Sequence, residues 1–274
     1  LEDGRVSAVV LEDGSEVAAS AVLLAGGHSA RELYRELETL GVAMELKEFA
    51  VGARLEHEAS AIDRIQLGPQ AGHPSLGAAS YRLAHTWQLG DDEGGQRALY
   101  SFCMCPGGYV LNAATEPDGV VSNGMSNHGH RGRFSNAAMV VNVAARDLPA
   151  DGGLLRGMVW QRGLETAAAA AANPAGGCHA LPAQRLVDFL AGRPSRTLPE
   201  CSSPNPVVAA PLHELLPRFV VDGMATGLEV FERRMRGLIS PDALLVGVET
   251  RTSAPVRILR DEASRQSPTA AGLY

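Results

Sequence analysis

The sequence of 274 residues is poor in cysteine, and the spacing of its cysteines argues against two common kinds of site. The four cysteines are Cys103, Cys105, Cys178 and Cys201. They do not form the regular pattern of a disulfide-stabilised secreted domain. A structural zinc site usually places two to four residues between paired cysteines, whereas one residue separates Cys103 from Cys105. His128 and His130 could complete a set of ligands with these thiols, but we predict no metal site.

The sequence also lacks an excess of positive charge, a long apolar run and an internal repeat. Its formal net charge is −7, with an isoelectric point near 5.6, which argues against binding to nucleic acid or to an anionic membrane. The sequence contains no run of about 18 apolar residues, the length needed to span a bilayer. We therefore predict no nucleic-acid partner and no membrane partner, and the lack of a charged-then-apolar leader predicts a cytoplasmic location. The sequence indicates no oligomeric state.

The two ends of the chain read like the interior of a domain. The sequence starts at Leu1 rather than at a methionine, and it stops after an apolar tail, Ala270–Tyr274. Natural termini are usually polar and loosely held. We therefore expect the chain to be a fragment of a longer protein.

The centre of the chain, Tyr100–Val143, alternates β-type segments with turns rich in Gly, Asn and Pro. The predicted strands are Leu99–Met104, Tyr109–Ala113, Val120–Ser122 and Met139–Val143. Between the first two lies Pro106-Gly107-Gly108, a turn whose bare N–H groups could admit a flat or anionic ligand. The alternative is a β-meander with tight turns and no ligand.

The first 41 residues predict a hairpin, a buried strand, a Gly-Gly turn and a helix. Val6–Leu11 and Glu16–Ala18 flank an Asp-Gly turn, and Ala21–Ala25 is continuously apolar, as is typical of a strand buried on both faces. After Gly26 and Gly27, Ser29 and Glu32 form a potential capping box. The expected helix buries Leu33, Leu37 and Leu40 and ends at Gly41. This order places N–H groups where α/β sheets bind phosphates, although a close-packed turn without ligand fits equally well.

The remaining elements are predicted from periodicity and from turn residues. We expect strands at 49–57, 81–89, 243–248 and 256–259, helices at 154–172, 182–190 and 219–235, loops at 58–78 and 193–217, and a polar turn at 91–95. Arg54 and Glu56 would share one face of their strand and could pair with each other.

These elements predict an α/β fold assembled from distant segments. We expect residues 1–46 and 243–274 to form a partial Rossmann-type layer, because both contain short apolar strands that need cover on both faces. Residues 47–242 would then form an inserted mixed α+β domain, an antiparallel meander with helices.

Five segments resemble the uncharacterised bacterial FAD-dependent dehydrogenases, two-domain flavoproteins of the glutathione-reductase type. The segments are AVLLAGGHSAR (21–31), KEFAVGARLEH (47–57), SFCMCPGG (101–108), SNGMS (122–126) and GVETRTSAPVRILRD (247–261). Members of that family carry an upstream GxGxxG motif and a further FAD-contacting segment after the tripeptide GLY, neither of which occurs in this sequence. The resemblance therefore implies a flavoprotein fragment that binds FAD weakly.

The resemblance also implies roles for individual residues. Gly26, Gly27, His28 and Ser29 would lie against the adenosine side of FAD, and Pro106, Gly107, Gly108, Thr252 and Ser253 would also contact the cofactor. Cys103 and Cys105 would pass electrons near the flavin ring, since alternating strand residues share a face; the alternative is that both thiols are core residues. Arg251 would bind a carboxylate substrate or a flavin oxygen, or would instead pair with Glu249. Cys178 and Cys201 are assigned to the core.

Three functions remain open at this point. The first is a FAD-dependent oxidoreductase of unidentified substrate, with NAD(P)H as a potential electron donor. The second is a flavoprotein for sensing or RNA modification, and the third is an inactive structural fragment. The loop 127–133 carries His128, His130, Arg131 and Arg133, which could hold a cofactor phosphate or form a solvated loop.

Overall fold

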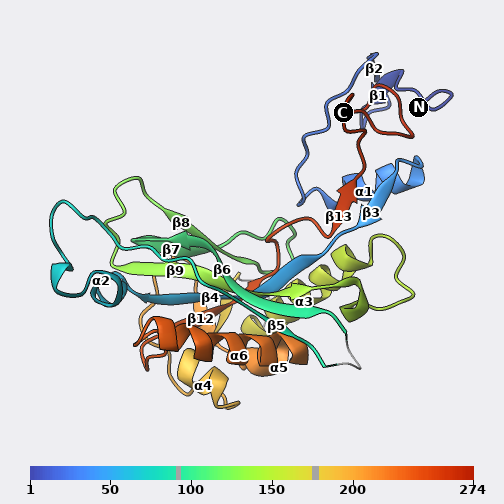
Figure 1. Cartoon of the computed structure of the whole chain (residues 1–274). Coiled ribbons are helices and arrows are strands. Elements are labelled where there is room, and N and C mark those ends of the chain that lie inside the picture. Colours follow the sequence, from blue (N-terminus) through green and yellow to red (C-terminus); the bar gives the residue numbers. More distant parts are fainter. Residues whose placement is uncertain (91–93, 175–178) are drawn as a thin grey trace. The chain divides into compact units, whose positions relative to one another are not determined.

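The computed structural model describes residues 1–90, 94–174 and 179–274 (Figure 1). Cys178 and part of the predicted turn at 91–95 lie outside these described residues. The chain forms two compact units, and each contains segments that are distant in sequence. Unit 1 comprises residues 1–49, 144–160 and 253–274, and unit 2 comprises residues 50–143 and 161–252.

Unit 1 contains two short antiparallel strand pairs and a helix. β1 (Ala8–Val10) pairs with β2 (Glu16–Ala18), and the predicted hairpin turn places Gly14 at a positive φ of 79°. The helix α1 (Arg31–Thr39) is followed by Gly41 at φ 70°, as expected for a helix C-terminus. β3 (Met44–Leu46) pairs with β13 (Val256–Ile258), which joins the two ends of the chain in one unit.

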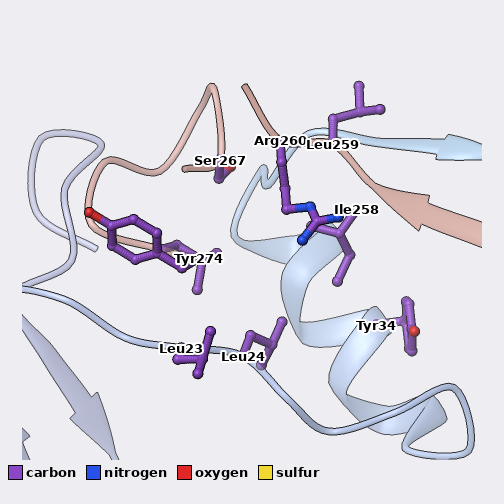
Figure 2. A pocket seen from close by; sticks show the side chains of 9 residues that line it. Leu23, Leu24, Tyr34, Ile258, Leu259, Arg260, Ser267 and Tyr274 are labelled. Carbon is purple, nitrogen blue, oxygen red and sulfur yellow. The ribbon is translucent and has the colours of Figure 1, made fainter. Parts of the chain in front are cut away.

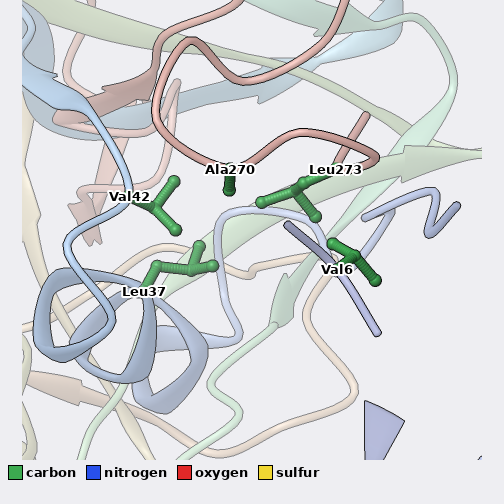
Figure 3. Packing of buried hydrophobic residues seen from close by; sticks show 5 residues of the cluster. All are labelled: Val6, Leu37, Val42, Ala270 and Leu273. Carbon is green, nitrogen blue, oxygen red and sulfur yellow. The ribbon is translucent and has the colours of Figure 1, made fainter. Parts of the chain in front are cut away.

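The core of unit 1 is built from both ends of the chain. Val6, Leu37 and Val42 pack with Ala270 and Leu273 in one buried cluster (Figure 3). A second cluster comprises Tyr34, Met158 and Val256. Burial of this apolar surface, at about 25 cal/mol per Å², is the main force that holds the terminal segments together.

Three details of the N-terminal prediction are wrong. Ala21–Ala25 is not a strand buried on both faces, since the side chain of Leu23 is 80% exposed. Val22 and Leu24 instead exchange backbone hydrogen bonds of 2.8–2.9 Å with Gly272 and Tyr274, so alternate residues face outward. The capping box does not begin the helix at Ser29, because the N-cap position is Ala30, and Leu40 is exposed.

Unit 2 is organised around a seven-stranded mixed sheet, which confirms an α/β protein. The strand order is β11 (Val207–Ala209), β10 (Leu181–Arg185), β12 (Leu244–Glu249), β4 (Phe49–Glu58), β9 (Phe134–Val143), β6 (Gln96–Cys105) and β5 (Ala84–Gln88). β10 and β11 are parallel, whereas β12 runs antiparallel to both β10 and β4. A separate hairpin joins β7 (Gly108–Asn112) to β8 (Ser122–Ser126).

Helices cover one face of this sheet. α6 (Arg218–Arg234) contacts β5, β6 and β9, and it lies on the same side as α4 (Leu186–Leu190) and α5 (Leu212–Leu215) (Figure 1). A Cβ at Gly227 would lie 2.5 Å from Leu99, so glycine permits the close approach of α6 to the sheet. The other helical segments are α2 (Ala59–Leu67), α3 (Arg156–Ala172), η1 (Gly68–Gln70) and η2 (Ala145–Asp147). Among the described residues, no helix is both long and apolar enough to cross a membrane.

Several predicted elements differ from those observed. The strand at 243–248 exists, but it lies in the seven-stranded sheet between β4 and β10 and not in a layer with Ala21–Ala25. The interior of this larger sheet supplies the cover that its apolar side chains require. The loop predicted at 58–78 contains α2, whose single fully buried residue, Ile62, gives a weak periodic signal. The helix predicted at 182–190 divides into β10 and the one-turn helix α4.

Candidate functional site

A bulge in β6 presents Cys103 to solvent. The pairing with β9 shifts register between Phe102 and Cys105, so β6 contains one more residue than its partner across this interval. Cys103 adopts φ 43°, a left-handed conformation that is rare for residues other than glycine, and its side chain is exposed. Backbone strain of this kind, at about 1–3 kcal/mol, persists only where surrounding contacts enforce it.

Arg54 supplies those contacts from the centre of the sheet. Its side chain is completely buried, and its Nε donates to a carboxylate oxygen of Glu249 at 3.0 Å. Its Nη1 donates to Oδ1 of Asn136 at 2.9 Å and to the carbonyl oxygen of Cys103 at 3.0 Å, and Nη2 donates to Oδ1 of Asn123 at 3.3 Å. One guanidinium therefore ties β4 to β6, β8, β9 and β12 and fixes the backbone at Cys103.

Two glycines make room for this arrangement. A Cβ at Gly124 would lie 2.1 Å from Nη1 of Arg54, and a Cβ at Gly52 would lie 1.9 Å from the carbonyl oxygen of Met139. Both distances are too short for any side chain. Gly124 is thus required for the guanidinium to reach β8, and Gly52 for β4 to approach β9.

The two central thiols lie in different environments. Cys105 is buried, its Sγ donates to the carbonyl oxygen of Cys103 at 3.3 Å, and burial raises the pKa of its thiol although the charge of Arg54 opposes the shift. The strand alternation that we expected to place both thiols on one face is broken by the bulge. Cys105 therefore has the surroundings of a core residue, whereas Cys103 is available to react.

A cavity of about 510 Å³ lies beside Cys103 within unit 2. It is bounded by the segment that leads into β5 and by the second half of β6. Tyr81, Tyr100 and Phe102 contribute aromatic surface to it, and Arg82 contributes a cation. This volume lies within the range of about 300–1,000 Å³ that is typical of small-molecule sites.

The turn Pro106–Gly108 is filled by protein. The N–H of Gly107 donates to Oγ of Ser135 at 3.0 Å, and its carbonyl oxygen accepts from the N–H of Gly132 at 3.1 Å. Gly107 and Gly108 are both buried, and a Cβ at Gly107 would lie 2.3 Å from the carbonyl oxygen of His130. The glycines are therefore needed for packing, and the N–H of Gly107 is not bare.

Arg251 forms an ion cluster of its own. Its Nη2 pairs with Glu165 at 2.9 Å and also with Glu116, and its Nη1 donates to Oγ1 of Thr115 at 2.7 Å. Hydrogen bonds to these carboxylates raise the pKa of the guanidinium, against the effect of its burial. The alternative prediction of a bridge to Glu249 is wrong, because Glu249 pairs with Arg54.

The other predicted cofactor residues lie in both units. The hydroxyl of Thr252 bonds to the backbone of Ala50, with distances of 3.2 Å to its nitrogen and 3.0 Å to its oxygen, and Ser253 is half-buried. Gly26 and Gly27 are exposed in unit 1, where Gly27 adopts φ 70° in open space. His28 and Ser29 are half-buried next to them.

Unit 1 has a small cavity of about 220 Å³, which is lined in part by Leu23 and Leu24, just before the Gly-Gly segment in sequence (Figure 2). Leu23, Leu24, Tyr34 and Ile258 give it an apolar lining, and Arg260 adds a cation. In the exposed loop 127–133, Arg133 pairs with Glu58 at 2.9 Å and also with Glu200, which argues against the phosphate-binding alternative. No group of three His, Cys, Asp or Glu side chains among the described residues could hold a metal ion.

Comparison with known proteins identifies the family. Residues 48–252 match the model of the FAD-dependent protein, C-terminal domain-like family, and this range includes all of unit 2. The chain belongs to this family. It is also 40% identical, over 275 aligned residues, to an uncharacterised protein of Clostridium beijerinckii (strain ATCC 51743 / NCIMB 8052). That match covers the whole chain and 50% of the relative, so the chain spans about half the length of this curated family member.

The residues that sequence reasoning missed are those that surround Arg54. They are Asn123, Asn136 and Glu249, each on a different strand. The one available signal was a charged residue inside an otherwise apolar strand, Phe49–Leu55. Periodicity cannot identify its partners, because they lie between 49 and 195 residues away along the chain.

Proposed function

We propose that the chain is part of a FAD-dependent oxidoreductase that acts on a small molecule. In this proposal residues 1–46 and 253–274 belong to a Rossmann-type FAD-binding domain, and unit 2 is the inserted domain that binds substrate. The match of residues 48–252 to a FAD-dependent family carries the proposal. The net charge of −7 argues against the alternative of RNA modification.

Unit 1 fits the adenosine end of FAD in three respects. The backbone at Gly27 is open, so a ligand can approach closely, and the apolar cavity lined by Leu23 and Leu24 is adjacent in sequence. The helix α1 begins a few residues later and directs its positive dipole end toward this segment. Gly26 is also constrained by packing, since a Cβ there would lie 2.7 Å from Leu33.

Unit 2 supplies the groups that face the substrate. FAD, when bound, can accept or donate two electrons, with NAD(P)H as a potential donor. Cys103 is the proposed thiol beside the reacting atoms, because it is exposed at a cavity and held by Arg54. Cys105 and Arg251 become positioning residues, since the first is buried and the second is fully engaged with Glu165 and Glu116. Pro106, Gly107, Gly108 and Thr252 are the cofactor contacts proposed for unit 2, and His28, Ser29 and Ser253 are those proposed for unit 1.

Titration of FAD into the purified chain, followed by flavin fluorescence, tests the role of unit 1. We expect weak but saturable binding that the change Gly27→Ala reduces at least fivefold. Gly14→Ala is the matched control, because Gly14 also has a positive φ in open space but lies in the β1–β2 turn. Equal effects of the two changes, or no binding by the unaltered chain, would contradict the proposed contribution of unit 1.

A further inference from the structure

The cavity beside Cys103 is lined by a tyrosine that can donate a hydrogen bond to a ligand. Tyr81 is 8% exposed as a residue, and its hydroxyl forms no hydrogen bond with any described residue. Burial raises the pKa of this phenol, with the nearby charge of Arg54 opposing the shift, so the group is a neutral donor. A ligand that brings an acceptor into the cavity can therefore accept a hydrogen bond from this hydroxyl.

The charge of the cavity favours an anionic ligand. Arg82 is exposed, forms no ion pair within the described part of the chain, and lies beside Tyr81 in sequence. Among the described residues that line the cavity, none is acidic. A carboxylate can accept from the Tyr81 hydroxyl and the Arg82 guanidinium together, since each of its two oxygens is an acceptor.

The remaining surface of the cavity favours a flat apolar group. Tyr100 and Phe102 are partly buried. They pack against Ala50, Ala138 and Val140, whose short side chains leave space above the sheet for the two rings. Both aromatic side chains line the cavity, and aromatic rings stack preferentially with other flat rings. Cys103 lies at the same wall, so its thiol would lie beside the bound molecule.

We propose that this cavity binds an aromatic carboxylate, with its carboxylate at Tyr81 and Arg82 and its ring against Tyr100 and Phe102. This ligand would be the substrate of the proposed oxidoreductase. Its role as a substrate rests on that proposed function, but its binding to the cavity does not. Binding itself requires no flavin. A ligand in this position covers the Cys103 thiol.

Protection of Cys103 from alkylation tests the proposal on the purified chain without FAD. The chain is treated with iodoacetamide in the presence of trans-cinnamate, and modification of Cys103 is followed by peptide mass spectrometry. We expect saturable protection by cinnamate, and at least tenfold weaker protection by cinnamyl alcohol, which lacks the charge, and by cyclohexylacetate, which lacks the flat ring. Equal protection by the alcohol, or no saturable protection by cinnamate, would overturn the proposal.

Two variants connect this protection to the named residues. Arg82→Gln should weaken protection by cinnamate about tenfold. Tyr81→Phe, which removes the hydroxyl but retains the aromatic ring, should weaken it several-fold. Arg196→Gln is the matched control, an exposed arginine that lines a different cavity, and it should change nothing. Unchanged protection in the Arg82 and Tyr81 variants would overturn the assignment. Failure of the proposed FAD function would instead appear as no flavin binding while cinnamate protection persists.

Discussion

Arg54 and Glu56 are two buried charged residues on the same strand, and they have different kinds of partner. We expected them to pair with each other, but Arg54 pairs with Glu249, whereas Glu56 accepts from the N–H of Ser202 at 2.9 Å and from its hydroxyl. Glu56 thereby anchors the proline-rich connector at 193–217, since Oγ of Ser202 also accepts from the N–H of Val110. Because Glu56 forms no ion pair with a described residue, burial raises the pKa of its carboxyl.

This environment predicts how stability depends on pH. Below about pH 4.5, the ordinary pKa of glutamate, Glu56 is protonated in both states and its burial costs little. As the pH rises, the unfolded state loses this proton before the folded state does, so the free energy of unfolding falls until the pH passes the folded pKa. The change Glu56→Gln keeps hydrogen-bonding groups for Ser202 and removes the charge, so its stability relative to the wild type should increase from pH 4 to pH 7.

Urea denaturation of the wild type and Glu56→Gln at several pH values measures this difference. Glu58→Gln controls for the loss of one negative charge, because Glu58 is exposed at the end of the same strand. A stability difference between wild type and Glu56→Gln that stays constant across this pH range would contradict the interpretation.

At the scale of elements, Arg54 connects strands whose association cannot be predicted from local sequence patterns. Its donors reach groups on β6, β8, β9 and β12, and Gly124 leaves space for the guanidinium. Removing one partner of a buried ion pair leaves the other charge without compensation, which costs about 3–5 kcal/mol, whereas an exposed pair contributes about 1 kcal/mol or less.

The change Arg54→Ala should therefore lower the free energy of unfolding by about 3–5 kcal/mol. Arg133→Ala is the matched control, since Arg133 also forms ion pairs, with Glu58 and Glu200, but its side chain is 60% exposed, and we expect a loss of no more than about 1 kcal/mol. Chemical denaturation followed by circular dichroism compares the two variants. Similar losses would show that the Arg54 network does not hold the strands together.

Elements with a strong local signal could be predicted from the sequence, and those defined by distant partners could not. The Asp-Gly hairpin, the α1 helix and α6 are confirmed because turn residues and helical periodicity are local. The bulge at Cys103 was not predicted, because it depends on a register shift against β9 and on the Arg54 side chain. Likewise Ala243–Val248 was correctly identified as a strand, but its placement between β4 and β10 depends on pairing across the chain.

At the scale of the whole molecule, the chain combines two units with different proposed tasks. Unit 2 lies entirely within the part of the chain that matches the FAD-dependent protein, C-terminal domain-like family. Unit 1 brings residues 1–49 and 253–274 together in shared cores, in keeping with the proposed FAD-binding domain. We propose that Cys103, held at the β6 bulge, is the thiol that contacts the flavin.

The visible spectrum of the full-length protein loaded with FAD tests this claim most directly. A thiolate in contact with an oxidised flavin produces a long-wavelength charge-transfer band. We predict that Cys103→Ser abolishes this band without lowering FAD occupancy, whereas Cys105→Ser retains it. An unchanged spectrum in Cys103→Ser, or loss of the band in Cys105→Ser alone, would contradict the account.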